Sequence, residues 1–123
     1  MGAIEETLVL KEKYPDRKIY DVDSLAASLG QGLLVHYAVQ KKNEGLTIEE
    51  LYNWLMDNLL KLCHWFTVDD LFYLKRGGRV SGTAAVMGTV LSIKPVMHVD
   101  DNGKLIPKAK VIGRKRAIET MVE

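Results

Sequence analysis

The chain of 123 residues lacks several features that would narrow its class at once. Its only cysteine is Cys63, which excludes an internal disulfide and suits a reducing compartment. Lys and Arg total 17 against 16 Asp and Glu, so the net charge of +1 predicts no nucleic-acid partner. No apolar run approaches the roughly 20 residues that cross a bilayer. We therefore expect a soluble, cytoplasmic protein without stable membrane insertion.

Motifs for common cofactors are also missing. Gly30 and Gly32 follow a predicted strand, but the dinucleotide fingerprint needs glycine or alanine where Val35 stands. No glycine is followed by Lys and then by Ser or Thr, which excludes a phosphate-binding P-loop. The three histidines are too scattered for zinc ligands: His36, His64 and His98. We predict that the chain uses no metal and no cofactor.

Two pairs of reactive side chains have simpler structural explanations than catalysis. Cys63 and His64 are adjacent on a predicted strand, where neighbouring side chains point to opposite faces and cannot easily share a proton. We predict Cys63 to be a small core residue. Asp69 and Asp70 stand where a helix should begin, and capping explains them without general acid–base catalysis.

The apolar content of 47% and charged content of 27% are those of an ordinary globular domain. Helical spacing and caps predict five helices. The first covers 4–13, the second begins at 24 or 28 and ends at 43, the third begins at 47, the fourth covers 69–75 and the last begins at 114. Runs rich in β-branched and aromatic residues predict strands over 17–22, 62–68, 93–99 and 104–111, and residues 81–92 predict a buried helix or turn. This order predicts an α/β fold in which helices pack on a mixed sheet.

Local signals define the ends of several elements. Thr47 and Glu50 form a predicted capping box. Asp69 is the predicted cap of the next helix, and Gly77 its left-handed terminator.

Near the C-terminus, Asp100-Asp101-Asn102-Gly103 contains the Asn-Gly pair that is typical of a β-hairpin turn. Pro95 and Pro107 fall inside the two flanking strands. Because proline has no backbone N–H to donate, we expect both strands to lie at sheet edges, or the prolines to lie at strand ends.

The most informative stretch runs from Ile19 to Val35. A short β-like run gives way to hydroxyls at Ser24 and Ser28 and to glycines at Gly30 and Gly32, before an apolar helical pattern. Small residues let a ligand approach the backbone closely, and a helix N-terminus suits an anion. The stretch predicts a seat for a carboxylate or phosphate. The alternative is a capped, close-packed strand-to-helix turn.

Two basic clusters are further candidates for anion contact. In Lys75-Arg76-Gly77-Gly78-Arg79-Val80-Ser81, guanidinium groups and free N–H groups could converge on one anion. In Gly113-Arg114-Lys115-Arg116, basic charge at a predicted helix start opposes the helix dipole, which points to a partner, an acidic surface or a phosphate. The sequence leaves open a solvated helix terminus for the first cluster and a solvated face for the second.

Together these motifs resemble the DegV family. The matching segments follow the family's order and spacing: Asp23-Ser24 with Ser28-x-Gly30-x-Gly32, residues 63–71, residues 73–80, and Ile93-Lys94-Pro95-Val96. The resemblance implies a protein that binds one fatty acid between two α/β domains. It further implies a non-catalytic subunit that presents the fatty acid carboxylate to the separate catalytic subunit of bacterial fatty acid kinase.

The resemblance also implies roles for single residues. Those expected to bind the ligand are Ser28, which matches the serine at the carboxylate, then Ser24, Gly30 and Arg79. Those expected to contact the phosphate or the kinase subunit are Arg114 and Arg76. Residues that would line the acyl tunnel, or be plain core, are Leu29, Leu33, Val86, Met87, Val90, Leu91 and Ile93.

The chain is shorter than typical members of the family that it resembles. We expect residues 1–60 to be the end of the first, parallel α/β, DegV-like domain and 61–123 the start of the second, unless both pack as a single unit. A half-formed cleft would expose apolar surface and favour a homo-oligomer. Two alternatives stay open: a small phosphotransferase or hydrolase that uses Arg79 and Ser28 on a phosphorylated metabolite, and a remnant that binds no ligand and acts through protein contacts.

Overall fold

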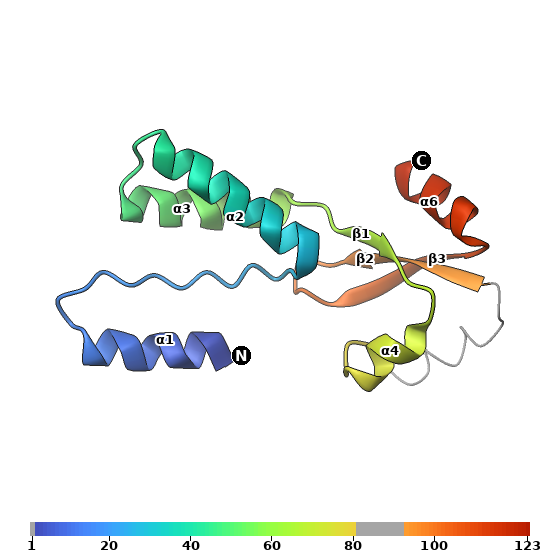
Figure 1. The fold of residues 1–123 in the computed structure, drawn as a ribbon, viewed down its shortest axis with the longest axis horizontal. Coiled ribbons are helices and arrows are strands. Elements are labelled where there is room, and N and C mark those ends of the chain that lie inside the picture. Colours follow the sequence, from blue (N-terminus) through green and yellow to red (C-terminus); the bar gives the residue numbers. More distant parts are fainter. Residues whose placement is uncertain (1, 81–92) are drawn as a thin grey trace. The chain divides into compact units, whose positions relative to one another are not determined.

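The computed structural model of the chain describes residues 2–80 and 93–123 (Figure 1). They belong to two compact units, Met1–Leu62 and Cys63–Glu123. The helix or turn predicted over 81–92 lies outside the described residues. Of the helices that the structure describes, none combines the length and apolar character needed to span a bilayer.

The described elements of the first unit are all helical, and the helices predicted over 4–13, to 43 and from 47 are confirmed. Its elements are α1 (Gly2–Lys13), α2 (Ser28–Asn43), α3 (Ile48–Asn58) and the short 3-10 helix η1 (Leu59–Lys61). Of the two predicted starts for α2, the structure selects Ser28. Helices α2 and α3 pack against each other, and the buried apolar side chains of this unit are Leu34 of α2 and Leu59 of η1.

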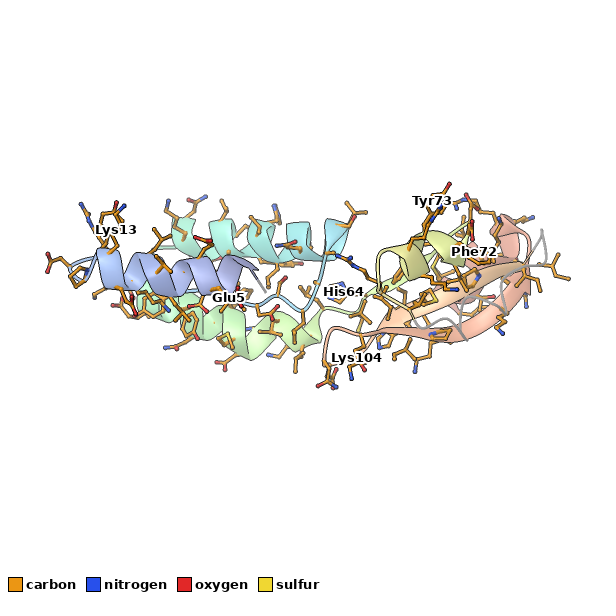
Figure 2. All side chains as sticks on the ribbon, turned by 90° about the horizontal axis from the view of Figure 1, so that it is seen from below. Glu5, Lys13, His64, Phe72, Tyr73 and Lys104 are labelled. Carbon is orange, nitrogen blue, oxygen red and sulfur yellow. The ribbon has the colours of Figure 1, made fainter. Side chains whose placement is uncertain are left out.

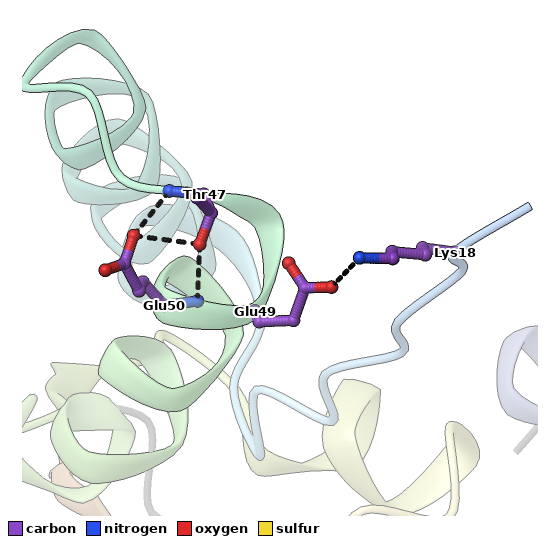
Figure 3. A network of polar contacts seen from close by, with 4 residues as sticks. All are labelled: Lys18, Thr47, Glu49 and Glu50. Carbon is purple, nitrogen blue, oxygen red and sulfur yellow. Dashed lines mark hydrogen bonds and ion pairs between the residues drawn. The ribbon is translucent and has the colours of Figure 1, made fainter.

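The predicted capping box at the start of α3 is confirmed (Figure 3). The Thr47 N–H donates to Glu50 Oε2 at 2.8 Å, and the Glu50 N–H donates to Thr47 Oγ1 at 3.3 Å. The Thr47 hydroxyl also donates to Glu50 Oε2, at 2.8 Å. The backbone and hydroxyl bonds from Thr47 to this carboxylate lower the pKa of Glu50. In the same turn, Glu49 forms an ion pair with Lys18 of the segment before α2.

The strand predicted over 17–22 is wrong. The chain is irregular there, because the other described elements of this unit are helices and offer no strand to pair with. Side chains hold the segment instead. Lys11 of α1 forms an ion pair with Asp21 at 2.5 Å, and the rings of Tyr20 and Tyr52 lie 4.9 Å apart between centroids.

The second unit packs helices on a sheet and confirms the predicted C-terminal hairpin. Its elements are β1 (Trp65–Thr67), α4 (Leu71–Arg76), β2 (Ile93–Val99), β3 (Leu105–Ile112) and α6 (Arg114–Val122). The three described strands run in the order β1-β2-β3, and both pairs are antiparallel. At the hairpin, the Asp100 carboxylate accepts N–H bonds from Asn102 and Lys104, and Gly103 takes the left-handed φ of +74°.

Both predicted ends of α4 are shifted by one residue. Asp70, not Asp69, is the N-cap, and its carboxylate accepts the Phe72 N–H at 2.7 Å. Gly77 has a right-handed φ of −76°, so the left-handed residue after the helix is Gly78, with φ of +71°. Asp69 does not cap the helix because its carboxylate pairs with a lysine of β2.

The predicted buried strand over 62–68 is shorter and more exposed than expected. Strand β1 pairs only with the middle of β2, opposite His98, Met97 and Val96, which limits its length to three residues. Trp65 remains 44% exposed at its start. Cys63, predicted as core, is exposed because it precedes the strand and has no place in the sheet.

The two prolines occupy different places in the sheet. Strand β2 is central, so its Pro95 is not on an edge strand. It is tolerated because, among the described strands, β1 pairs only from Val96 onward and β2 is paired on one side at Pro95. Pro107 does lie on an outer strand, where β3 faces Met97 next to a bulge.

The core of the second unit lies on both sides of β2. The neighbouring residues Val96 and Met97 are 0% and 1% exposed, although strand geometry points them to opposite faces. Met97 packs with Leu71 of α4, and α6 contacts all three strands through a face that includes the fully buried Ala117. Figure 1 shows α4 and α6 on opposite sides of the sheet.

Replacing Met97 with alanine should cost about 2–5 kcal/mol of unfolding free energy, because truncation of a buried side chain loses apolar contacts and leaves a cavity. The matched control is Met56→Ala, at a side chain that is 45% exposed, where a change within about 0.5 kcal/mol is expected. Urea unfolding followed by circular dichroism measures both. Equal losses in the two variants would contradict the placement of the core.

Candidate functional site

The start of α2 leaves backbone donors open. The N-cap residue is Ala27, which makes no side-chain capping bond. The first N–H of the helix to reach a backbone acceptor is that of Gln31, which donates to the Ala27 carbonyl at 3.4 Å. The N–H groups of Ser28, Leu29 and Gly30 precede it and have no acceptor among the residues that the structure describes. Together with the helix dipole they suit an anion.

The turn that leads into α2 is held in an unusual conformation. Leu25 and Ser28 have left-handed φ angles of +50° and +52°, which non-glycine residues adopt only at a cost. Asp23 Oδ1 accepts the Leu25 N–H at 3.0 Å, and the Ser24 hydroxyl donates to the Ala26 carbonyl at 3.3 Å. Ser24 is thus half-buried and occupied, whereas Ser28 is exposed and makes no hydrogen bond to the residues that the structure describes.

Apolar side chains stand beside this open helix end. Leu29 is 88% exposed and Leu33, one turn further along α2, is 43% exposed. The third described candidate for an apolar lining, Ile93, is half-buried at the start of β2. The other candidates lie outside the described residues: Val86, Met87, Val90 and Leu91.

The basic end of α4 is ordered by aromatic stacking. The guanidinium of Arg76 lies 4.6 Å from the ring centroid of Tyr73, and the ammonium of Lys75 lies 6.0 Å from that of Phe72. Tyr73 is 69% exposed and points away from the sheet (Figure 2). The stacked cations are therefore accessible at the surface.

The predicted convergence of free N–H groups after α4 is wrong. The N–H groups of Gly77, Gly78 and Arg79 donate to carbonyls of α4, at 3.0, 2.8 and 2.8 Å, because the chain winds back over the last helical turn. The Arg79 guanidinium is exposed and donates from Nη1 to the Gly77 carbonyl. From Gly77 to Arg79 the described residues therefore offer an anion side-chain charge and no free N–H group.

A network of three charged side chains joins three elements of the second unit. Asp69, in the loop before α4, accepts from Lys94 of β2, with Nζ at 3.0 Å from Oδ1 and 3.3 Å from the Asp69 carbonyl oxygen. Arg114, the first residue of α6, lies 3.8 Å from the same Oδ1. Lys94, first by its hydrogen bond and then by its charge, and Arg114 by its charge hold the pKa of Asp69 below its usual range.

The remaining basic residues of that cluster have partners within α6. Lys115 pairs with Glu119 at 4.0 Å, and Arg116 pairs with Glu119 at 3.7 Å and with Glu123 at 3.5 Å. These exposed pairs along one helix contribute little to stability. Lys115 and Arg116 thus have acidic partners on their own helix. The basic charge at the helix start that lacks a partner within α6 is that of Arg114, which pairs with Asp69 outside the helix.

Charge is divided unevenly between the two units. Residues 63–123 hold ten Lys or Arg and six Asp or Glu, whereas residues 1–62 hold seven Lys or Arg and ten Asp or Glu. The nearly neutral chain therefore consists of an acidic unit and a basic unit. A surface with an excess of positive charge attracts anionic groups and acidic partners over distances of about the Debye length, roughly 10 Å.

The predicted site residues fall into two groups. Ser24, Ser28 and Gly30 lie within the turn and first turn of helix at the start of α2, in the first unit. Those in the second unit are Arg76 and Arg79 at the end of α4 and Arg114 at the start of α6. Within the described residues, no group of three or more His, Cys, Asp or Glu side chains could hold a metal ion.

Sequence reasoning missed three contributors to the basic group. Tyr73 orders Arg76, and the spacing of three residues on a predicted helix was a sufficient signal for that contact. Lys94 and Asp69 are 25 residues apart in the sequence and meet only because β2 runs beside the loop before α4. No local pattern predicts such a contact.

These features define an α/β chain with a helix N-terminus open to an anion and a separate basic helix–sheet unit. A family model described as "Uncharacterised protein, DegV family" matches residues 2–123. The chain therefore belongs to the DegV family, and the resemblance seen in its motifs is confirmed.

Individual relatives agree with this assignment. A DegV domain-containing protein of Clostridium perfringens is 54% identical over 114 residues, which are 93% of this chain and 39% of that protein. A fatty-acid-binding DegV family protein of Thermus thermophilus has a similar structure, with a TM-score of 0.81 at 33% identity over 98% of this chain and 42% of that one. The fatty acid kinase (Fak) B3 protein of Streptococcus pneumoniae, loaded with linoleic acid, also has a similar structure. Its TM-score is 0.87 at 25% identity, over 97% of this chain and 42% of that one. The chain thus spans about two fifths of the length of these relatives.

The titration of Asp69 tests the charged network directly. We expect Lys94→Met to raise the pKa of this carboxyl more than Arg114→Gln does, because Lys94 supplies both the hydrogen bond and the larger charge effect. Since the folded pKa is lowered, any stability from the network is present above the ordinary pKa of about 3.9 and is lost as the pH falls through the lowered value. Carbon-13 NMR of the carboxyl measures the pKa. The same value in the wild type and in Lys94→Met would contradict the network.

Proposed function

We propose that this chain supplies the carboxylate seat of a fatty-acid-binding protein. The observation that carries the proposal is the start of α2, where three open N–H groups and the exposed Ser28 hydroxyl adjoin Leu29 and Leu33. A fatty acid has the matching parts, a carboxylate followed directly by an apolar chain. The same seat suits an inorganic anion less well, because the exposed leucines would then have nothing to bury.

Elementary energetics support a fatty acid at this place. A hydrogen bond from a neutral donor to a carboxylate contributes about 1.5–3 kcal/mol. Each methylene removed from water adds about 0.8 kcal/mol, so a long acyl chain can provide most of the affinity once a cover is present. Two of the relatives support the same ligand class: the Thermus protein is described by its fatty acid binding, and the pneumococcal protein holds linoleic acid.

The basic unit is the second part of the proposal. We infer that Arg79 lies near the carboxylate or its acyl phosphate in the whole protein, and that Arg76 and Arg114 contact the phosphate or a kinase catalytic subunit. The excess of basic residues in 63–123, and the ordered, accessible guanidinium of Arg76, support contact with an anionic group or an acidic partner. On this proposal residues 1–60 end the first domain and residues 61–123 begin the second.

The proposal makes the chain a binding component, with phosphoryl transfer carried out by the partner. The Fak B3 protein among the similar structures supports this division of labour. Neither unit needs a nucleotide site for such a role. The location of the protein in the cytoplasm stays a prediction from the sequence.

We expect Ser28→Ala to weaken the binding of a fluorescent long-chain fatty acid about tenfold or more, because it removes one hydrogen bond to a charged group. The matched control is Thr120→Ala, which removes a hydroxyl that donates to the Arg116 carbonyl at 2.9 Å on α6, far from the seat in sequence. Fluorescence titration measures both affinities. Full affinity in Ser28→Ala would contradict the role of this serine.

Native mass spectrometry of the purified wild-type chain, followed by lipid extraction, tests the ligand class itself. Near one fatty acid per chain or per dimer is expected. A folded chain that carries no lipid and takes up none would contradict the proposal for this chain. Turnover of ATP or of a phosphate ester by the chain alone would contradict the binding-only role and favour an enzyme.

A further inference from the structure

We propose that Asp69 is a positioning residue, which orients Arg114 toward the anion that Arg114 is proposed to contact. The inference rests on that proposed function. Its basis is the shared carboxylate that joins the loop before α4, strand β2 and the first residue of α6. It concerns a residue that sequence analysis explains as a helix cap, a role that the structure gives to Asp70.

Asp69 lies on a segment that is held through its own contacts and those of its neighbours. Its neighbour Asp70 caps α4, and the next residue, Leu71, is 4% exposed in the core. Lys94 reaches both the carboxylate and the backbone carbonyl of Asp69, and its own side chain is only 19% exposed. The backbone on both sides of Asp69 is thus held in place, and the bond from Lys94 restrains the carboxylate although its side chain is 71% exposed.

Arg114 and Asp69 are both open to solvent where they meet. The side chain of Arg114 is 61% exposed and that of Asp69 is 71% exposed, and Arg114 Nη1 lies 3.8 Å from Asp69 Oδ1. A guanidinium has five N–H donors in one plane, so an ion pair at Nη1 restricts the range of positions that the group can take and leaves other donors for an oxyanion. Asp69 therefore limits the orientation of Arg114 without occupying all of its donors.

The charges of the network favour an external anion. Lys94 and Arg114 share one carboxylate, so the three side chains carry one uncompensated positive charge. Arg114 also stands at the first position of α6, where the helix dipole disfavours a cation. Asp69 offsets part of that repulsion, and a phosphate group would compensate the remaining charge.

The test depends on whether removal of the Asp69 charge strengthens or weakens the binding of phosphate. Asp69→Asn removes a negative charge, and by Coulomb's law alone the variant should bind inorganic phosphate more tightly than the wild type. If Asp69 orients Arg114, the variant should bind phosphate at least about threefold more weakly despite the gained charge. The matched control is Asp101→Asn, which makes the same charge change at an exposed turn of the same unit and should bind phosphate equally well or slightly better. Nitrogen-15 NMR of the Gly113–Arg116 amides measures the affinity in the full chain.

A second readout separates orientation from folding. The side-chain Nε–H signal of Arg114 should move to the position of a solvated arginine in Asp69→Asn and stay in place in Asp101→Asn. The backbone signals of α6 should remain those of the folded helix in both variants. Unfolded α6 signals in Asp69→Asn would mean a merely structural role and would overturn the inference.

Arg114→Gln distinguishes the two ways of failing. If this variant loses phosphate binding while Asp69→Asn keeps it, the positioning role is overturned and the proposed role of Arg114 stands. If the wild type binds no phosphate, or Arg114→Gln binds it as well as the wild type, the proposed role of Arg114 fails and the inference falls with it.

Discussion

The burial of strand β2 on both of its faces is the constraint on which the second unit depends. Val96 and Met97 are adjacent, point to opposite faces and are almost fully buried, so a helix must cover each side of the sheet. Helix α4 meets this need on the face of Met97, and α6 lies on the other side (Figure 1). Each arginine of the proposed basic site stands on one of these helices or directly after it. The packing of two apolar side chains thus determines where the charged groups are presented.

The charged network shows how packing on the sheet brings charged side chains together. Asp69, Lys94 and Arg114 come from three segments that are far apart in the sequence, and only the packing on β2 brings them to one place. The side chains of Asp69 and Arg114 are mostly exposed, so the contribution of the network to stability is small. The proposed effect of the network is on the position of Arg114, because a paired guanidinium loses less freedom when an oxyanion binds.

The start of α2 follows a different principle. Here the binding groups are backbone N–H groups, left open because Ala27 cannot cap the helix, and a strained turn holds Ser28 at the same end. A helix usually satisfies these donors with a side chain of its own. A sequence that omits the cap, and places exposed leucines along the next turn, keeps both a polar and an apolar surface available to one amphipathic ligand.

The sequence by itself determined the elements whose signals are local: the capping box of Thr47 and Glu50, the Asn-Gly hairpin, the end of α2 at Asn43, and the family through its ordered motifs. Such signals need only neighbours within a few residues, so they survive without knowledge of the fold. Tertiary structure alone decided the rest. Residues 17–22 have strand-like composition but no described strand to pair with, and Pro95 is tolerated in a central strand because β1 pairs only from Val96 onward. Asp69 pairs with Lys94 of β2 and Arg114 of α6 instead of capping α4. In each case the outcome depends on a partner distant in the sequence, and which segments become neighbours is fixed by the burial of the core and not by local propensity.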